Sequence, residues 1–174
     1  MPADAPRRLP GAVLFACNLN QVRSPMAEGL LKRLVGDRVY VDSCGLRLPA
    51  MTHDDARDED VDAGVDPFVR TVMAELGCDV GRHRPKTFDE LEDSSFDLVV
   101  SLTPEAQHHA VELARGRAVD IEYWPTFDPT LIDGSREARL EAYRAVRDAL
   151  ADRIAERFGG AGPSPIDLAP HGAL

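Results

Sequence analysis

The hydrophobic positions of the chain fall into two kinds of run that alternate along its length. Short continuous apolar runs predict buried strands at residues 12–16, 39–43, 96–102 and 121–124. Between and after these runs, apolar residues recur at helical spacing and predict helices at about 24–35, 68–76, 104–116 and 135–158. Strands that alternate with helices predict an α/β protein, in which helices cover both faces of a parallel sheet.

The extent of these runs predicts one domain. The 174 residues suffice for a single hydrophobic core, and we place the domain at residues 11–158. Residues 1–10 and 159–174 are predicted to be flexible termini. Residues 46–66 are polar and acidic, and we expect a solvated loop there. A metal site in this loop is a weaker alternative, because its carboxylates follow no calcium-loop spacing.

The charge and composition of the chain limit its expected binding partners and its expected cellular compartment. A formal net charge of −10 makes nucleic acid an unfavourable partner. No apolar run reaches the roughly 18 residues that a membrane span requires, and the first ten residues lack the apolar core of a signal peptide. Three cysteines without regular spacing argue against a disulfide framework. We therefore expect a cytoplasmic protein without a membrane partner.

The most informative stretch is the loop at residues 17–25, CNLNQVRSP, directly after the first predicted strand. A loop between a strand and a helix start gathers free backbone N–H groups at the positive end of the helix dipole, so it suits an anion. Cys17 supplies a thiol that becomes a nucleophile as a thiolate, and Arg23 supplies a planar fork for two oxygens of an oxyanion. Ser24 and Pro25 are predicted to begin the helix, as N-cap and first helical residue. The loop predicts a site of phosphoryl transfer.

This arrangement, in which Arg and Ser follow Cys after five residues at a strand-to-helix turn, resembles the phosphate-binding loop of the low-molecular-weight protein tyrosine phosphatases. The match continues to Glu28 and includes the pair Asp128–Pro129 far downstream. The resemblance covers roughly residues 11–158 and extends to the arsenate reductases of the same fold. It implies a four-stranded parallel sheet in the order 2-1-3-4.

The resemblance also implies roles for individual residues. Cys17 is the expected nucleophile and Arg23 the clamp on the oxyanion. Asp128, which by its place before proline would mark only a turn, is the expected general acid. The expected phosphate-binding residues are Asn18, Leu19, Asn20, Gln21, Val22, Arg23 and Ser24. Neither a metal nor another cofactor is implied.

A second set of residues is expected to hold the loop in shape. Asn20 suits the left-handed backbone angle that a loop wrapped around phosphate needs. In the resembled family an Asn at this place joins a Ser of the second strand, a His and the Ser after the Arg. Here these positions match Asn20, Ser43, His83 and Ser24. The resemblance further gives the Ser24 hydroxyl a hydrogen bond to the departing sulfur.

The chain departs from the family pattern at several positions. Leu19 replaces the usual Gly, and Val22 replaces a second Cys that many members carry beside the Arg. Thr130 replaces the Tyr that stacks on a phosphotyrosine ring. Thr103 stands where thioredoxin-coupled arsenate reductases place their first relay cysteine. The remaining cysteines, Cys44 and Cys78, are expected to be structural.

The function predicted from the sequence is hydrolysis of a phosphomonoester through a cysteinyl-phosphate. The expected partner is a phosphorylated protein or small molecule, or phosphate itself as an oxyanion. One alternative is an arsenate reductase that uses Cys17 alone together with an external small thiol. A module that only binds an oxyanion is a third, and it is disfavoured because Cys17, Arg23 and Asp128 are all intact.

Overall fold

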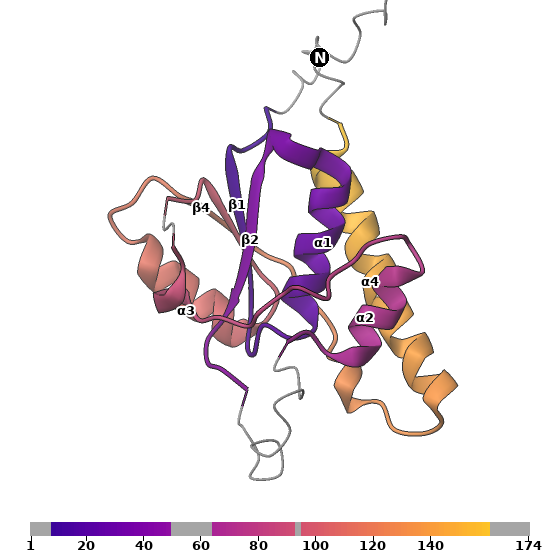
Figure 1. Ribbon diagram of the computed structural model, residues 1–174. Coiled ribbons are helices and arrows are strands. Elements are labelled where there is room, and N and C mark those ends of the chain that lie inside the picture. Colours follow the sequence, from indigo (N-terminus) through magenta and orange to yellow (C-terminus); the bar gives the residue numbers. More distant parts are fainter. Residues whose placement is uncertain (1–7, 50–63, 93–94, 161–174) are drawn as a thin grey trace, which may run out of the picture.

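A four-stranded parallel sheet forms the centre of the computed structural model, which describes residues 8–49, 64–92 and 95–160 (Figure 1). Its strands are β1 (Ala12–Cys17), β2 (Tyr40–Gly45), β3 (Leu98–Ser101) and β4 (Asp120–Tyr123). They lie in the order β2-β1-β3-β4, and every neighbouring pair is parallel. The predicted sheet, including its order, is confirmed.

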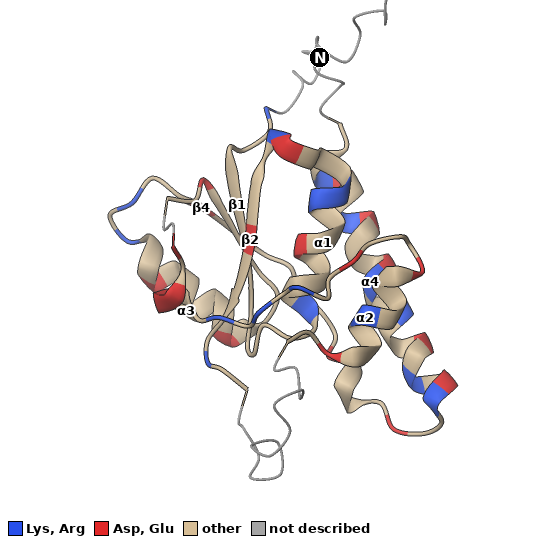
Figure 2. Cartoon of the chain, in the orientation of Figure 1, with Lys and Arg blue, Asp and Glu red and all other residues tan. Residues whose placement is uncertain are grey.

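Helices cover the two faces of this sheet unequally. The α-helices are α1 (Arg23–Val35), α2 (Pro67–Ala74), α3 (Pro104–Ala114) and α4 (Arg136–Phe158). Short 3₁₀ turns are η1 (Gly36–Arg38), η3 (Phe88–Glu90) and η4 (Pro129–Leu131). Figure 1 shows α1, α2 and α4 on one side of the sheet and α3 on the other. Charged residues are found mainly on the helices and loops, and few are on the strands (Figure 2).

The alternation of side chains along β1 divides the core between the two faces. Val13, Phe15 and Cys17 belong to the larger cluster, under α1 and α4, whereas Leu14 and Ala16 belong to the smaller one. The long helix α4 adds buried residues at helical spacing to the first face. By contrast, α3 buries only Ala106 and Ala110. The face under α3 is therefore the more thinly covered one.

One local prediction is wrong, namely that Ser24 caps α1 and Pro25 is its first residue. The helix begins at Arg23, its N-cap is Val22, and no side chain caps it. The reason is that the Ser24 hydroxyl bonds Cys17 and Asn20 instead. The backbone N–H groups of the first turn are thus left for another acceptor.

Several predicted segments fall outside the described residues. Residues 50–63 of the expected solvated loop, and residues 1–7 and 161–174 of the expected flexible termini, are among them. Within the described ranges, no helix has the length and apolar character needed to cross a membrane.

Candidate active site

The loop that follows β1 surrounds a small cavity at the carboxyl end of the sheet. Cys17 ends β1, which lies between β2 and β3, the point at which ligands bind in open parallel sheets. The cavity has a volume of about 180 Å³. It is lined by Cys17, Asn18, Leu19, Gln21, Val22, Arg23, Arg47, Asp66, Asp128 and Thr130. The three residues expected to be catalytic therefore share one cavity, although they come from distant parts of the chain.

The side chains of Asn20 and Ser24 are buried behind the loop backbone and do not line the cavity. Both side chains are completely buried. Asn20 has a φ of 55°, the left-handed angle expected for it, and no other non-glycine residue of the described segments has a positive φ. Leu19 thus does not need the conformation that favours glycine, so its Cβ is compatible with the loop.

The amide of Asn20 organises a buried hydrogen-bond network. Its Oδ1 accepts the backbone N–H of Lys86 at 3.0 Å, which fixes the orientation of the amide. Its Nδ2 then donates to the hydroxyls of Ser24 at 2.8 Å and Ser43 at 2.9 Å. The Ser24 hydroxyl, which accepts this bond, lies 2.9 Å from the Cys17 sulfur and 3.4 Å from the carbonyl oxygen of Cys44, so it can donate its proton to the sulfur when Cys17 is a thiolate and carries no proton of its own. Ser24 is therefore placed to stabilise a thiolate at Cys17.

Three ionisable side chains extend the network. Ser43 donates to Glu28 Oε1 at 2.6 Å, and Lys32 binds Glu28 Oε2 at 2.7 Å. His83 Nε2 donates to the main-chain carbonyl of Asn20 at 2.8 Å, and burial lowers the pKa of this histidine. Sequence reasoning named Ser43 and His83 but gave no role to Glu28. The sequence did contain a signal for Glu28, because a residue four positions after Ser24 lies on the same face of the helix.

Two further supports of the loop were missed from the sequence. A Cβ on Gly45 would lie 2.8 Å from the carbonyl oxygen of Asn18, so only glycine allows this close approach. Thr103 caps α3 and donates its hydroxyl to Asn18 Oδ1 at 2.7 Å. At the place of the relay cysteine this chain therefore has a residue that braces the loop.

Arg23 and Asp128 face each other across the cavity. Arg23 donates to the carbonyl of Thr126 at 3.1 Å, and its Nη2 lies 3.9 Å from Asp128 Oδ2. The other carboxylate oxygen of Asp128 accepts both the N–H and the hydroxyl of Thr130, at 3.0 and 2.7 Å. These bonds turn Oδ2 toward the guanidinium. A substrate bound beside Cys17 would meet a guanidinium and a carboxyl group together.

The aromatic residues near Asp128 do not line this cavity. Trp124 is buried and packs edge-on against Phe15 of the core. Phe127 is 56% exposed, yet it is absent from the lining of the cavity within the described residues. Thr130 takes the place of the expected stacking ring. The walls are thus polar or aliphatic.

The other two cysteines do not line the active-site cavity, although Cys44 is near enough to Cys17 for the charge of a Cys17 thiolate to raise the pKa of Cys44. Cys44 pairs in register with Ala16 and packs with it on the α3 face, opposite the face that Cys17 joins. Burial raises the pKa of Cys44 far above its usual value. Cys78 lies against Gly29 of α1, and burial raises its pKa as well. Neither thiol lines the active-site cavity.

A cysteine and an arginine share one cavity at the switch point of a 2-1-3-4 sheet, an arrangement that suits a tetrahedral oxyanion. The model of the family described as low molecular weight phosphotyrosine protein phosphatase matches residues 12–156. The chain belongs to this family.

Known relatives include both reductases and phosphatases. The arsenate reductase of Halalkalibacterium halodurans is 31% identical over 144 residues, which cover 82% of this chain and 91% of the relative. Among solved structures, the tyrosine phosphatase AmsI of Erwinia amylovora has a TM-score of 0.66 at 18% identity and covers 91% of this chain and 97% of its own. An arsenate reductase in the phosphate binding state has a TM-score of 0.61 at 25% identity, covering 87% and 98%. Further curated relatives are also arsenate reductases.

Proposed function

We propose that the protein hydrolyses phosphomonoesters through a phosphoryl group carried on Cys17. The observation that carries this proposal is the placement of the Asp128 carboxyl in the same cavity as Cys17, 3.9 Å from Arg23, with no second thiol among the lining residues described. Hydrolysis needs an acid–base group beside the nucleophile, whereas a relay within the protein needs a second thiol. Family membership and the phosphate-bound relative support an oxyanion as the ligand.

The proposed reaction has two steps. The Cys17 thiolate attacks phosphorus, the ester P–O bond breaks, and Asp128 gives its proton to the departing oxygen. Loop N–H groups and Arg23 hold the equatorial oxygens while charge redistributes. In the second step Asp128 takes a proton from water, which attacks phosphorus and breaks the P–S bond. Phosphate leaves, and the thiolate returns to its hydrogen bond with Ser24.

The residues that line the cavity indicate which class of phosphomonoester fits it. A small opening without an aromatic wall among the described residues gives no stacking platform for a phenyl ring. We therefore infer a phosphomonoester substrate that is not restricted to phosphotyrosine.

A steady-state assay of aryl phosphate hydrolysis tests this function. Cys17→Ser should bind inorganic phosphate but lose turnover, because a serine hydroxyl is mostly un-ionised there. Cys44→Ser and Cys78→Ser are matched controls on the same residue type and should keep the parent rate. Turnover by Cys17→Ser close to that of the parent would refute the mechanism.

Arsenate reduction with an external thiol is the second candidate, and the names of the curated relatives favour it over hydrolysis. Here Cys17 displaces water from arsenate to form an S–As bond. A small external thiol then attacks the Cys17 sulfur, which releases arsenite and leaves a mixed disulfide, and a second thiol reduces that disulfide. Arsenate gains the two electrons that the thiol pair loses. Cys44 and Cys78 would take no part, because Cys44 packs on the opposite face of the sheet and neither side chain lines the cavity.

The two candidate activities are distinguished by measuring arsenite formation and ester hydrolysis on the same protein preparation. Glutathione with glutaredoxin is the thiol source for one arm, and thioredoxin is the source for the other. We expect ester hydrolysis to exceed arsenite formation in both arms. Faster arsenite formation with glutathione would establish the reductase, and a disulfide from Cys17 to Cys44 or Cys78 would contradict both accounts.

A further inference from the structure

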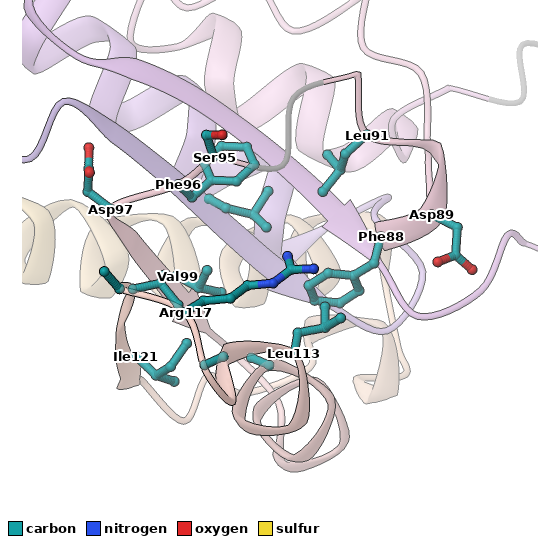
Figure 3. A pocket seen from close by; sticks show the side chains of 15 residues that line it. Phe88, Asp89, Leu91, Ser95, Phe96, Asp97, Val99, Leu113, Arg117 and Ile121 are labelled. Carbon is teal, nitrogen blue, oxygen red and sulfur yellow. The ribbon is translucent and has the colours of Figure 1, made fainter.

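A larger cavity lies on the other side of the sheet from the Cys17 thiol. It has a volume of about 580 Å³, within the range of roughly 300–1,000 Å³ that is typical of small-molecule sites. Its floor is the sheet face that carries Leu14, Val99 and Ile121 (Figure 3). One wall is α3, with Leu113, and the other is the segment around η3, with Phe88. We call it the α3 cavity.

The α3 cavity exists because α3 covers its sheet face with small side chains. Only Ala106 and Ala110 of this helix are buried, and alanines cannot fill the space above Val99 and Ile121. Leu113 stays 40% exposed at the rim. Of the floor residues, Leu14 and Val99 are buried, so an apolar ligand would cover mainly Ile121 and the side chains of the walls and rim.

The charge that lies across this apolar floor is positive. In Figure 3 the side chain of Arg117 extends over the cavity with its guanidinium toward Phe88. The carboxylate of Asp97 points away and accepts the backbone N–H of Ala12 at 2.9 Å. Asp89 is also directed outward in this view. A ligand with an apolar body and one anionic group matches this arrangement.

Both walls of the α3 cavity are attached to the phosphate loop. Beside the η3 wall, the backbone N–H of Lys86 donates to Asn20 Oδ1 at 3.0 Å. At the start of the α3 wall, the hydroxyl of Thr103 donates to Asn18 Oδ1 at 2.7 Å. A ligand that moves the walls apart would pull on these two bonds. Each wall of the cavity is thus one hydrogen bond away from a residue of the loop.

We propose that the α3 cavity is a regulatory site for a small amphipathic carboxylate, whose apolar body covers the sheet and whose carboxylate pairs with Arg117. Binding there opposes binding of an oxyanion at the loop, because the walls hold Asn18 and Asn20 in place only while both hydrogen bonds are made. By linkage, each ligand weakens the other by the same factor. The site is separate from the catalytic cavity and does not depend on which reaction occurs there.

Calorimetric titration of the full chain with 2-naphthoate, and with neutral 2-naphthamide as its matched probe, tests the site. Arg117→Gln should weaken 2-naphthoate about tenfold, the size of a partly exposed charge-assisted hydrogen bond, and leave 2-naphthamide unchanged. Ala114→Phe, which fills the cavity, should abolish binding of both probes. Arg115→Gln is the control, because Arg115 is 74% exposed and pairs with Glu112 outside the lining. Each variant is first checked for an unchanged circular dichroism spectrum and melting temperature.

Inorganic phosphate supplies the second measurement. Its dissociation constant, measured with and without saturating 2-naphthoate, should rise severalfold in the parent and stay unchanged in Ala114→Phe. Absence of 2-naphthoate binding at millimolar concentration would overturn the proposal. So would binding that survives in both Arg117→Gln and Ala114→Phe, since the probe would then occupy the phosphate loop or another surface. Binding at the α3 cavity with no change in phosphate affinity would overturn its regulatory role.

Discussion

Ser43 and Ser101 form a pair of buried serines whose replacement should have opposite consequences. Both lie on strands and are completely buried. Ser43 accepts a bond from Asn20 and donates one to the carboxylate of Glu28. The Ser101 hydroxyl has no hydrogen-bond partner among the described residues. We predict that Ser43→Ala is strongly destabilising and Ser101→Ala is neutral or stabilising.

The size of the difference follows from the bonds that each change removes. A neutral hydrogen bond contributes about 0.5–1.5 kcal/mol and one to a charged group about 1.5–3 kcal/mol, so Ser43→Ala should lower the free energy of unfolding by about 2–4.5 kcal/mol. Ser101→Ala removes a desolvated hydroxyl without losing a bond, so its effect should be about 0 to 1 kcal/mol in the stabilising direction.

Urea unfolding of both variants measures these free energies, and phosphate titration reports on the loop. Ser43→Ala should also weaken phosphate binding, since Asn20 loses one of its anchors, while Ser101→Ala should leave it unchanged. Equal losses of stability in the two variants would refute the reasoning. A stable Ser43→Ala with parent phosphate affinity would show that the network does not hold the loop.

Two further predictions concern ionisable groups. Asp128→Asn should lower kcat by about 10²–10⁴-fold for an ester with a poor leaving group and much less for the ester of an activated phenol, because only a poor leaving group needs a general acid. If a steady-state comparison gave equal losses for the two esters, the role of Asp128 would be structural. Burial holds the pKa of His83 below its usual value of 6.5. Near pH 6 the unfolded chain therefore binds more protons than the folded protein. The stability associated with neutral His83 is lost as the pH falls through the pKa that His83 has in the folded protein. His83→Gln, which keeps a donor, should lose less unfolding free energy than the parent between pH 7 and 5 in urea titrations, and parallel pH dependences would count against this role.

Much of the fold was predictable because the chain is locally consistent. The apolar run that precedes Cys17 and the one that ends at Leu102 are typical of strands buried on both faces, and β1 and β3 form there. Gly36 and Gly77 end helical segments with the positive φ that glycine permits. The order of the strands did not follow from periodicity. It came from the resemblance, because local pattern does not record which strands become neighbours.

The site was predictable where one short motif carries it, and less so where the contacts are distant. Cys17, Arg23 and the left-handed Asn20 lie in one loop, so their sequence spacing indicated their role. Thr103 meets Asn18 from 85 residues away, and no local pattern predicts such a bond. The error at Ser24 has the same origin, because its hydroxyl bonds Asn20 and Cys17 in preference to the helix end that its sequence position favours.

In the proposed reaction a phosphoryl group resides on Cys17 and is released by water with the help of Asp128. Mass spectrometry of peptides from Asp128→Asn, quenched in acid during turnover of an activated aryl phosphate, tests it most directly. The first step needs little acid assistance with such a leaving group, while the second lacks its base, so the intermediate should accumulate. We expect the peptide that contains Cys17 to carry the added mass of one phosphoryl group, and the corresponding peptide of Cys17→Ser to carry no added mass. Continued release of phosphate without that adduct, or an adduct on another residue, would contradict it.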